Sequence, residues 1–130
     1  MKDKVLIDTS AWIEYFRNTR LDLSKQVDEM LSRCSVYVPK VVIAELVQGA
    51  HSEKELSVIQ DFFDAFTVVG EGSDTWQKAG KLSYLLRKKG KTVSLIDCYI
   101  AIIAGEQNCA ILTLDKHFKD IEKESTINLI

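Results

Sequence analysis

The sequence has little that would interrupt or cross-link a folded domain. It has one proline and six glycines in 130 residues, and no proline-rich or low-complexity linker divides it. Its cysteines, Cys34, Cys98 and Cys109, are odd in number and form no Cys-x-x-Cys pair. This pattern indicates reduced thiols and argues against a disulfide framework or a cysteine-based zinc site. The length and composition predict one globular domain over residues 1–130.

Long apolar segments are also missing. No stretch approaches the roughly 20 apolar residues that a membrane-spanning helix needs. The N-terminal string MKDKVLID has too short an apolar run for a signal peptide and lacks a small-residue cleavage site. We therefore expect a soluble, cytoplasmic protein without a membrane partner.

An excess of positive charge is missing as well. The formal net charge is −2, which by itself disfavours a nucleic-acid partner. Bound divalent cations would reverse that balance locally, at the site that holds them. The net charge therefore neither supports nor excludes a nuclease.

Short apolar runs alternate with helical segments along the chain. Strands are expected at residues 4–7, 36–38, 65–69, 110–113 and 126–129, and helices at 11–16, 23–31, 39–49, 52–63, 74–89 and 94–107 and shortly after 115. Thr9 and Ser10 are expected to cap the first helix, and Pro39 to occupy the first position of the third. The alternation predicts a parallel sheet with helices on both faces.

Four acidic residues stand in apolar surroundings. Asp8 and Asp115 each follow an apolar strand, and Asp97 lies within an apolar helix. Glu45 is the only charged residue between Val41 and Val47. In parallel sheets, ligands bind beyond the carboxyl ends of the strands, which is where Asp8 and Asp115 are expected.

Each acid also has a purely structural interpretation. Asp8 and Asp115 can be helix N-caps, and Asp97, three residues after Ser94, can complete a capping box. As a set, however, four buried carboxylates without an accompanying Lys or Arg would be costly unless a cation neutralised them. Oxygen ligands without accompanying cysteine or histidine favour Mg²⁺ or Mn²⁺ over zinc.

Supporting groups lie beside these acids. The hydroxyls of Thr9, Ser10 and Thr113 are expected to hydrogen-bond the carboxylates or a bound phosphate. In this interpretation Asp8, Asp97 and Asp115 hold metal, the metal activates water against a phosphodiester, and Glu45 either binds metal or orients the water. His51 and His117 are interpreted as ordinary surface or helix-end residues.

These motifs resemble a known family. The strings Val5–Ser10, Ser94–Asp97 and Leu112–Phe118, together with Glu45, are similar in order and spacing to those of a PIN domain. The small size is similar to that of the VapC-like ribonuclease toxins of bacterial and archaeal toxin–antitoxin pairs. The resemblance covers essentially the whole chain, from Val5 to Phe118.

The resemblance implies a three-layer α/β/α fold with a central parallel sheet. It also implies endoribonuclease activity dependent on Mg²⁺ or Mn²⁺, homodimerisation, and inhibition by a small antitoxin protein. Asp8, Glu45, Asp97 and Asp115 match the acidic positions of the family. One departure is His117, where many relatives carry a further acid, and it leaves one or two metal ions as alternatives.

Two other classes of protein share some of these features. A phosphoacceptor signalling domain has the same kind of fold and an acidic Mg²⁺ pocket, but usually carries adjacent acids after the first strand, where this chain has Asp8 and Thr9. A non-catalytic metal-binding interaction module is the other alternative. An aspartyl-nucleophile phosphatase is disfavoured, because it usually needs an acid where Ser10 stands.

Overall fold

The computed structural model describes residues 3–130 and contains one five-stranded sheet. The strands are β1 (Lys4–Ile7), β2 (Ser35–Pro39), β3 (Thr67–Val69), β4 (Ala110–Leu112) and β5 (Asn128–Leu129). The helices are α1 (Thr9–Arg17), α2 (Leu21–Arg33), α3 (Lys40–Gln48), α4 (Glu53–Phe63), α5 (Thr75–Lys88), α6 (Leu95–Gln107) and α7 (His117–Glu124). All neighbouring strands pair in parallel, which confirms the predicted parallel sheet.

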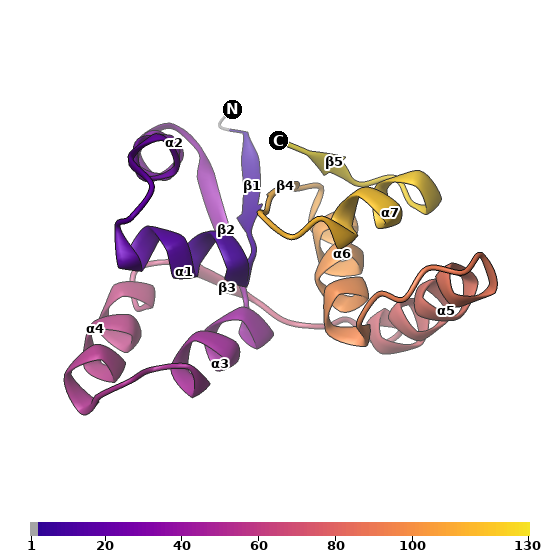
Figure 1. The fold of residues 1–130 in the computed structure, drawn as a ribbon, viewed down its shortest axis with the longest axis horizontal. Coiled ribbons are helices and arrows are strands. Elements are labelled where there is room, and N and C mark those ends of the chain that lie inside the picture. The colour runs from indigo at the N-terminus through magenta and orange to yellow at the C-terminus, as the bar shows by residue number, and fades with distance from the viewer. Residues whose placement is uncertain (1–2) are drawn as a thin grey trace.

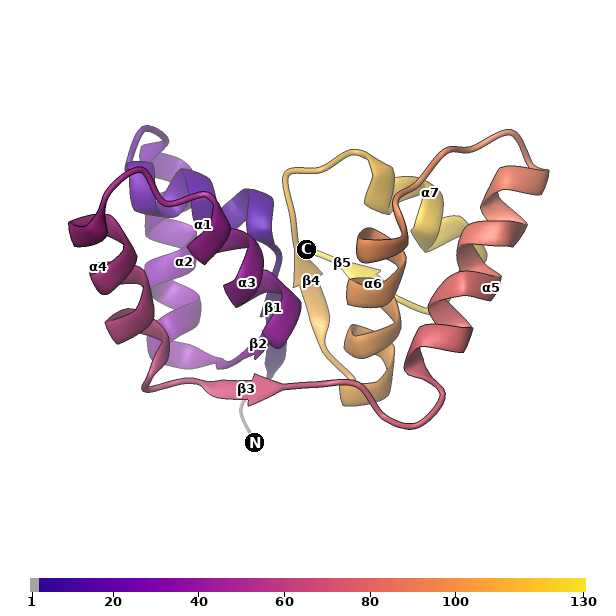
Figure 2. The same cartoon turned by 90° about the horizontal axis from the view of Figure 1, so that it is seen from below.

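The molecule has three layers. In two perpendicular views, α1 to α4 lie on one side of the sheet and α5 to α7 on the other (Figures 1 and 2). This arrangement confirms the α/β/α fold class. No helix in the part of the chain that the structure describes is long and apolar enough to cross a membrane.

The strand order β3-β2-β1-β4-β5 places the topological switch point between β1 and β4. At this point the order in which strands are added changes from one side of β1 to the other. From β1 the chain proceeds outward to β2 and β3, and it then crosses to the other side of β1 to add β4 and β5. Leu6 pairs with Ile111 and Ile7 with Leu112. The loops after β1 and β4 therefore begin side by side, at the topological position where such folds bind ligands.

The core on the α1–α4 side is built around Trp12, which is fully buried. Its ring centroid lies 5.1 Å from that of Phe63 and 5.5 Å from that of Phe62, both in edge-to-face geometry. Tyr15 and Phe16 extend the same cluster. Trp12 is thus the centre of an aromatic core cluster, against which the partly buried Tyr15 and Phe16 pack.

Two expected helix starts differ by a residue or two from the structure. Thr9 and Ser10 do not cap the first helix but lie in its first turn, because the Asp8 carboxylate accepts the Ala11 N–H and is itself the N-cap. Pro39 ends β2 and caps α3 instead of opening it. Both shifts leave the predicted elements in place.

Candidate metal centre

Asp8 lies at the carboxyl end of β1 and is almost fully buried, with 3% of its surface exposed. The Ser10 hydroxyl donates a hydrogen bond to Oδ1 at 2.6 Å, and the Thr113 hydroxyl donates one to Oδ2 at 2.6 Å. Burial raises the pKa of Asp8, and the two hydroxyl hydrogen bonds oppose that rise only in part. Asp8 is therefore both the N-cap of α1 and a buried carboxylate with a raised pKa.

The two hydroxyls also join the loops after β1 and β4. Ser10 Oγ accepts the Leu114 N–H at 3.0 Å, and Thr113 Oγ1 accepts the Asp115 N–H at 3.0 Å. Each hydroxyl thus donates to Asp8 and accepts a backbone N–H from the loop after β4. This double use fixes the backbone that carries Asp115 relative to Asp8.

Asp97 projects from the first turn of α6, whose start is fixed by Ser94. The Ser94 hydroxyl accepts the Asp97 N–H at 3.1 Å, which is the predicted cap. The half-buried Asp97 carboxyl has its pKa raised to about 6, first by desolvation and then by the negative charge of Asp115, with smaller contributions from Asp8 and Glu45. The four predicted acids therefore lie close enough for three of them to act electrostatically on the fourth.

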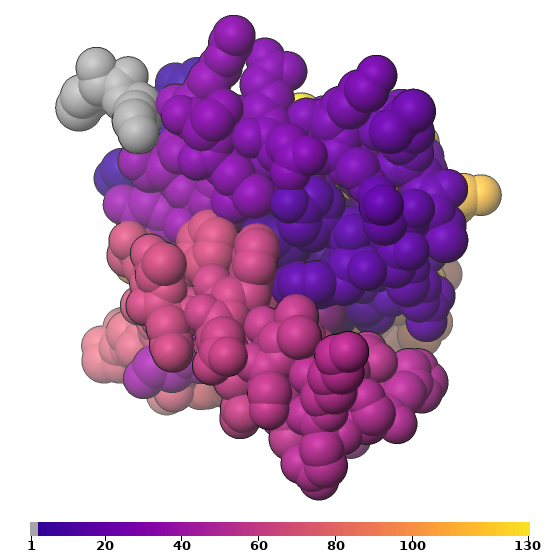
Figure 3. All heavy atoms as spheres, turned by 90° about the vertical axis from the view of Figure 1, so that its left-hand side faces the viewer, coloured from indigo at the N-terminus to yellow at the C-terminus, as the bar shows by residue number. Residues whose placement is uncertain are grey.

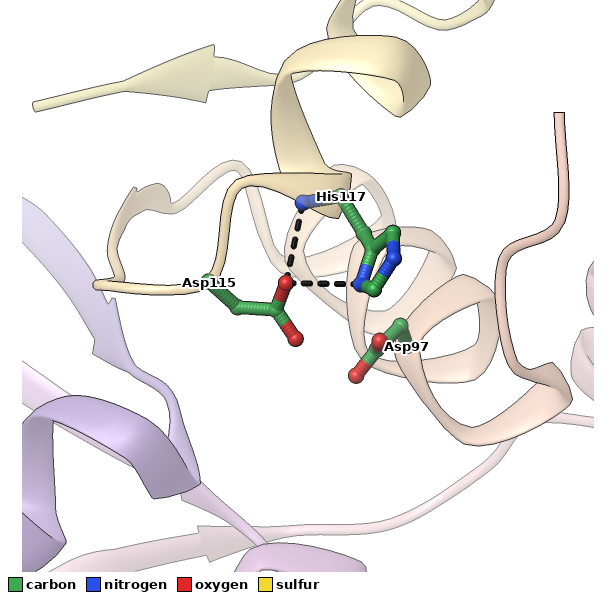
Figure 4. Close-up of side chains that lie close together, drawn as sticks. All are labelled: Asp97, Asp115 and His117. Carbon is green, nitrogen blue, oxygen red and sulfur yellow. Dashed lines mark hydrogen bonds and ion pairs between the residues drawn. The ribbon is translucent and has the colours of Figure 1, made fainter.

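Asp115 and Asp97 point into the same space (Figure 4). Asp115 Oδ1 accepts the His117 backbone N–H at 2.9 Å and lies 2.8 Å from His117 Nδ1. One ligand atom from each of Asp97, Asp115 and His117 lies within 4.8 Å of the other two. These three side chains are the part of the site that could hold one metal ion.

Glu45 lies on α3, on the other side of the sheet from α6 (Figure 2). It is half-buried, and the Thr9 hydroxyl donates a hydrogen bond to its Oε1 at 2.6 Å. Asp8 and Glu45 do not belong to the group of atoms within 4.8 Å. The site thus consists of a tight part at Asp97, Asp115 and His117 and a wider part at Asp8 and Glu45.

The charge of the cluster is not balanced by basic residues. Within residues 3–130, no lysine or arginine forms an ion pair with any of the four acids, and the only such contact is that of His117 with Asp115. Crowded carboxylates without a counter-charge are stabilised by a divalent cation, and carboxylate oxygens suit Mg²⁺ and Mn²⁺. The residues present therefore fit a divalent metal ion.

A groove of about 570 Å³ adjoins Glu45. It runs between α1, α3 and α4 and is lined by apolar side chains such as Ile13, Phe16, Leu46 and Val58. Val58 is 51% exposed. Figure 3 shows this side of the molecule, on which α1 and α2 lie above α4. Glu45 thus lies at the wall of a groove that is lined in part by apolar side chains of α1, α3 and α4.

A parallel α/β domain with crowded carboxylates at its topological switch point is typical of proteins that bind a divalent metal ion. Comparison with known proteins identifies the family. The family model of the PIN domain matches residues 5–124. The chain belongs to the PIN-domain family.

Two curated relatives illustrate the similarity. Ribonuclease VapC11 of Mycobacterium tuberculosis is 27% identical over 123 residues, with 92% of each chain covered. Ribonuclease VapC1 of Methanocaldococcus jannaschii is also 27% identical, with 94% of this chain and 84% of the relative covered. Among solved structures, VapBC2 from Rickettsia felis bound to a DNA fragment from its promoter matches with a TM-score of 0.80 at 18% identity, covering 98% of this chain and 97% of the other.

One residue beside the four acids was not among the predicted site residues. His117 was interpreted as an ordinary surface or helix-end residue, and it is an exposed residue at the start of α7. Its ring also contacts Asp115 and belongs to a group that could hold a metal. Its position two residues after Asp115, at the start of α7, was the available signal. A polar residue there is brought back toward Asp115 by the turn that the Asp115 side chain itself stabilises.

Proposed function

We propose that this PIN-domain protein is a metal-dependent endoribonuclease and the toxin of a toxin–antitoxin pair. The observation that carries the proposal is the geometry of the acidic cluster. Ligand atoms of Asp97, Asp115 and His117 lie within 4.8 Å of one another, the loop that carries Asp115 is hydrogen-bonded to the buried Asp8 through Thr113, and no lysine or arginine of residues 3–130 pairs with these acids. Such a cluster favours the binding of a cation. The relatives named ribonucleases support RNA as the substrate.

Each acid has a distinct part in the proposed mechanism. Asp97, Asp115 and Asp8 would hold the metal, and the hydrogen bonds that Ser10 and Thr113 donate to the two oxygens of Asp8 keep its carboxylate in place. Glu45, oriented by Thr9, accepts a proton from the attacking water or adds a ligand. A bound Mg²⁺ or Mn²⁺ supplies a lowered pKa for that water and stabilises the charge that develops on the phosphate oxygens.

The proposal predicts which substitutions abolish RNA cleavage. Purified wild type, Asp8→Asn and Asp97→Asn are compared on RNA with Mn²⁺ and with a chelator. Cleavage is expected only for wild type with metal, because each substitution removes a charged ligand and keeps the side-chain size. Asp61→Asn is the matched control, since Asp61 is an exposed acid of α4 outside the site. Undiminished cleavage by both site variants would remove the mechanism.

The alternative functions are separated by the same preparation. A phosphoacceptor domain would take up phosphate from acetyl phosphate at Asp8 and cleave no RNA. A non-catalytic metal-binding module would bind Mn²⁺ and do neither. RNA cleavage that requires Mn²⁺, without phosphorylation, distinguishes the nuclease from both.

The proposed partners are RNA, a small antitoxin protein and a second copy of the chain, in the cytoplasm. Structural neighbours that are VapBC complexes support the antitoxin. The apolar groove beside Glu45 suits such a partner, because a protein bound there would also cover an acid of the site. Co-expression with a neighbouring short reading frame, followed by co-purification and light scattering, tests both the antitoxin and the dimer.

A further inference from the structure

His117 brings an imidazole nitrogen to a site whose other side chains are carboxylates. Its Nδ1 lies 2.8 Å from Asp115 Oδ1. Adjacent ligand atoms around a six-coordinate ion with bonds of about 2.1 Å are separated by roughly 3 Å. The imidazole nitrogen and the carboxylate oxygen, which are joined here by an ion-pair contact, are therefore about as close as neighbouring ligands on one ion, so a cation that replaced the proton between them could bind both.

The third member of the group fits the same ion. Ligand atoms of Asp97, Asp115 and His117 all lie within 4.8 Å of one another. Ligands on opposite sides of a six-coordinate ion with bonds of about 2.1 Å are roughly 4.2 Å apart, so only a small inward movement is needed. In Figure 4, the carboxylates of Asp97 and Asp115 and the ring of His117 border one common space.

An ion would replace only one of the two contacts between these residues. Asp115 Oδ1 receives both contacts from His117, one from the backbone and one from the ring, so Oδ2 is not engaged by this residue. The ring contact is the one that an ion would replace, and the backbone contact would keep His117 beside Asp115. The His117 side chain is 56% exposed, so water can accept the remaining ring N–H once Nδ1 binds metal, as metal-bound histidines require.

We propose that His117 is a metal ligand in this protein and that its nitrogen makes the site select Mn²⁺ over Mg²⁺. The inference rests on the proposed metal-dependent function and specifies its cofactor. Mg²⁺ prefers a set of oxygen ligands, whereas imidazole is a common ligand of transition-metal ions. An acid at position 117 would make the set entirely oxygen, so the histidine is the residue that sets the preference.

The first experiment detects the nitrogen directly. Mn²⁺ is added to the full-length, untagged protein, and pulsed electron paramagnetic resonance measures coupling of the bound ion to ¹⁴N. Coupling typical of a coordinated imidazole is expected in wild type and is expected to disappear in His117→Gln. His51→Gln is the matched control, because His51 is the only other histidine of the chain, and it is expected to retain the signal.

The second experiment measures selectivity by calorimetric titration of Mn²⁺ and Mg²⁺. The ratio of the Mg²⁺ to the Mn²⁺ dissociation constant is expected to fall about tenfold or more in His117→Asp, which restores an oxygen ligand. An unchanged ratio, or Mn²⁺ bound without imidazole coupling, overturns the inference and leaves the proposed nuclease intact. Absence of Mn²⁺ binding together with absence of RNA cleavage would overturn both.

Discussion

Replacing Asp97 by asparagine is expected to stabilise the metal-free protein while it abolishes activity. In the folded protein the pKa of Asp97 is raised from 3.8 to about 6 by desolvation and by the charge of Asp115, with Asp8 and Glu45 adding to it. A carboxyl whose pKa is raised by folding disfavours the folded state once it ionises. Its contribution to stability is therefore present below about pH 4 and is lost as the pH rises through about 6.

The size of the effect follows from the shift. A change of about two pKa units corresponds to about 3 kcal/mol of unfolding free energy at neutral pH. Asp97 is only half-buried, so solvent screening reduces this to about 1–1.5 kcal/mol. For a chain of this length the gain corresponds to an increase of about 3–5 °C in Tm. Asparagine keeps the size of the side chain and its backbone N–H bond to Ser94.

Thermal unfolding of wild type and Asp97→Asn in a chelator, at pH 7.5 and at pH 4, measures this effect. The Tm difference is expected at pH 7.5 and should become much smaller at pH 4, where Asp97 carries no charge in the folded protein. Saturating Mn²⁺ should reverse the order, because wild type gains about 2.7 kcal/mol at a hundredfold excess over Kd. Asp61→Asn should show neither change. A variant less stable than wild type in the chelator at pH 7.5 would refute the reasoning.

Three further substitutions test the contacts that build the site and the core. Thr113→Val should lower the free energy of unfolding by about 1–3 kcal/mol in urea unfolding, since it removes the donor to Asp8 and the acceptor of the Asp115 N–H. Thr113→Ser keeps the hydroxyl and should retain most of the wild-type stability. Trp12→Ala should lower stability by about 3–5 kcal/mol, and a loss under about 1 kcal/mol would contradict the central position of this ring. Ser52→Ala should cost about 1 kcal/mol, because its hydroxyl accepts the Glu55 N–H at the start of α4, with no change in specific RNA cleavage by the folded protein.

Much of the local structure could be predicted from the sequence. The start of α4 at Ser52 and of α6 at Ser94 matched the expected caps, and the end of α5 near Gly90 agrees with the positive φ of 79° there. These features depend on residues three or four apart in the chain. Apolar runs likewise identified the central strands β1 and β4, because a strand buried on both faces needs a continuous apolar segment.

The start of α1 shows where local signals compete. Thr9, Ser10 and Asp8 can all cap a helix. The structure uses Asp8, because the hydroxyls of Thr9 and Ser10 are engaged elsewhere, on Glu45 and on Asp8 itself. Glu45 lies 36 residues further along the chain, so this choice follows from a contact that no local pattern contains.

The sequence by itself determined which residues are candidates for the site: four acids whose apolar surroundings make their charge costly, in a chain built of alternating strands and helices. Only the tertiary structure decided how they are combined. Thr113 reaches Asp8 across 105 positions because β1 and β4 pair in parallel at the centre of the sheet. The distances between side-chain atoms depend on that pairing and on the helices packed against it, and for this reason the proximity of His117 to Asp97 and Asp115 is visible in the fold and not in the pattern of residues.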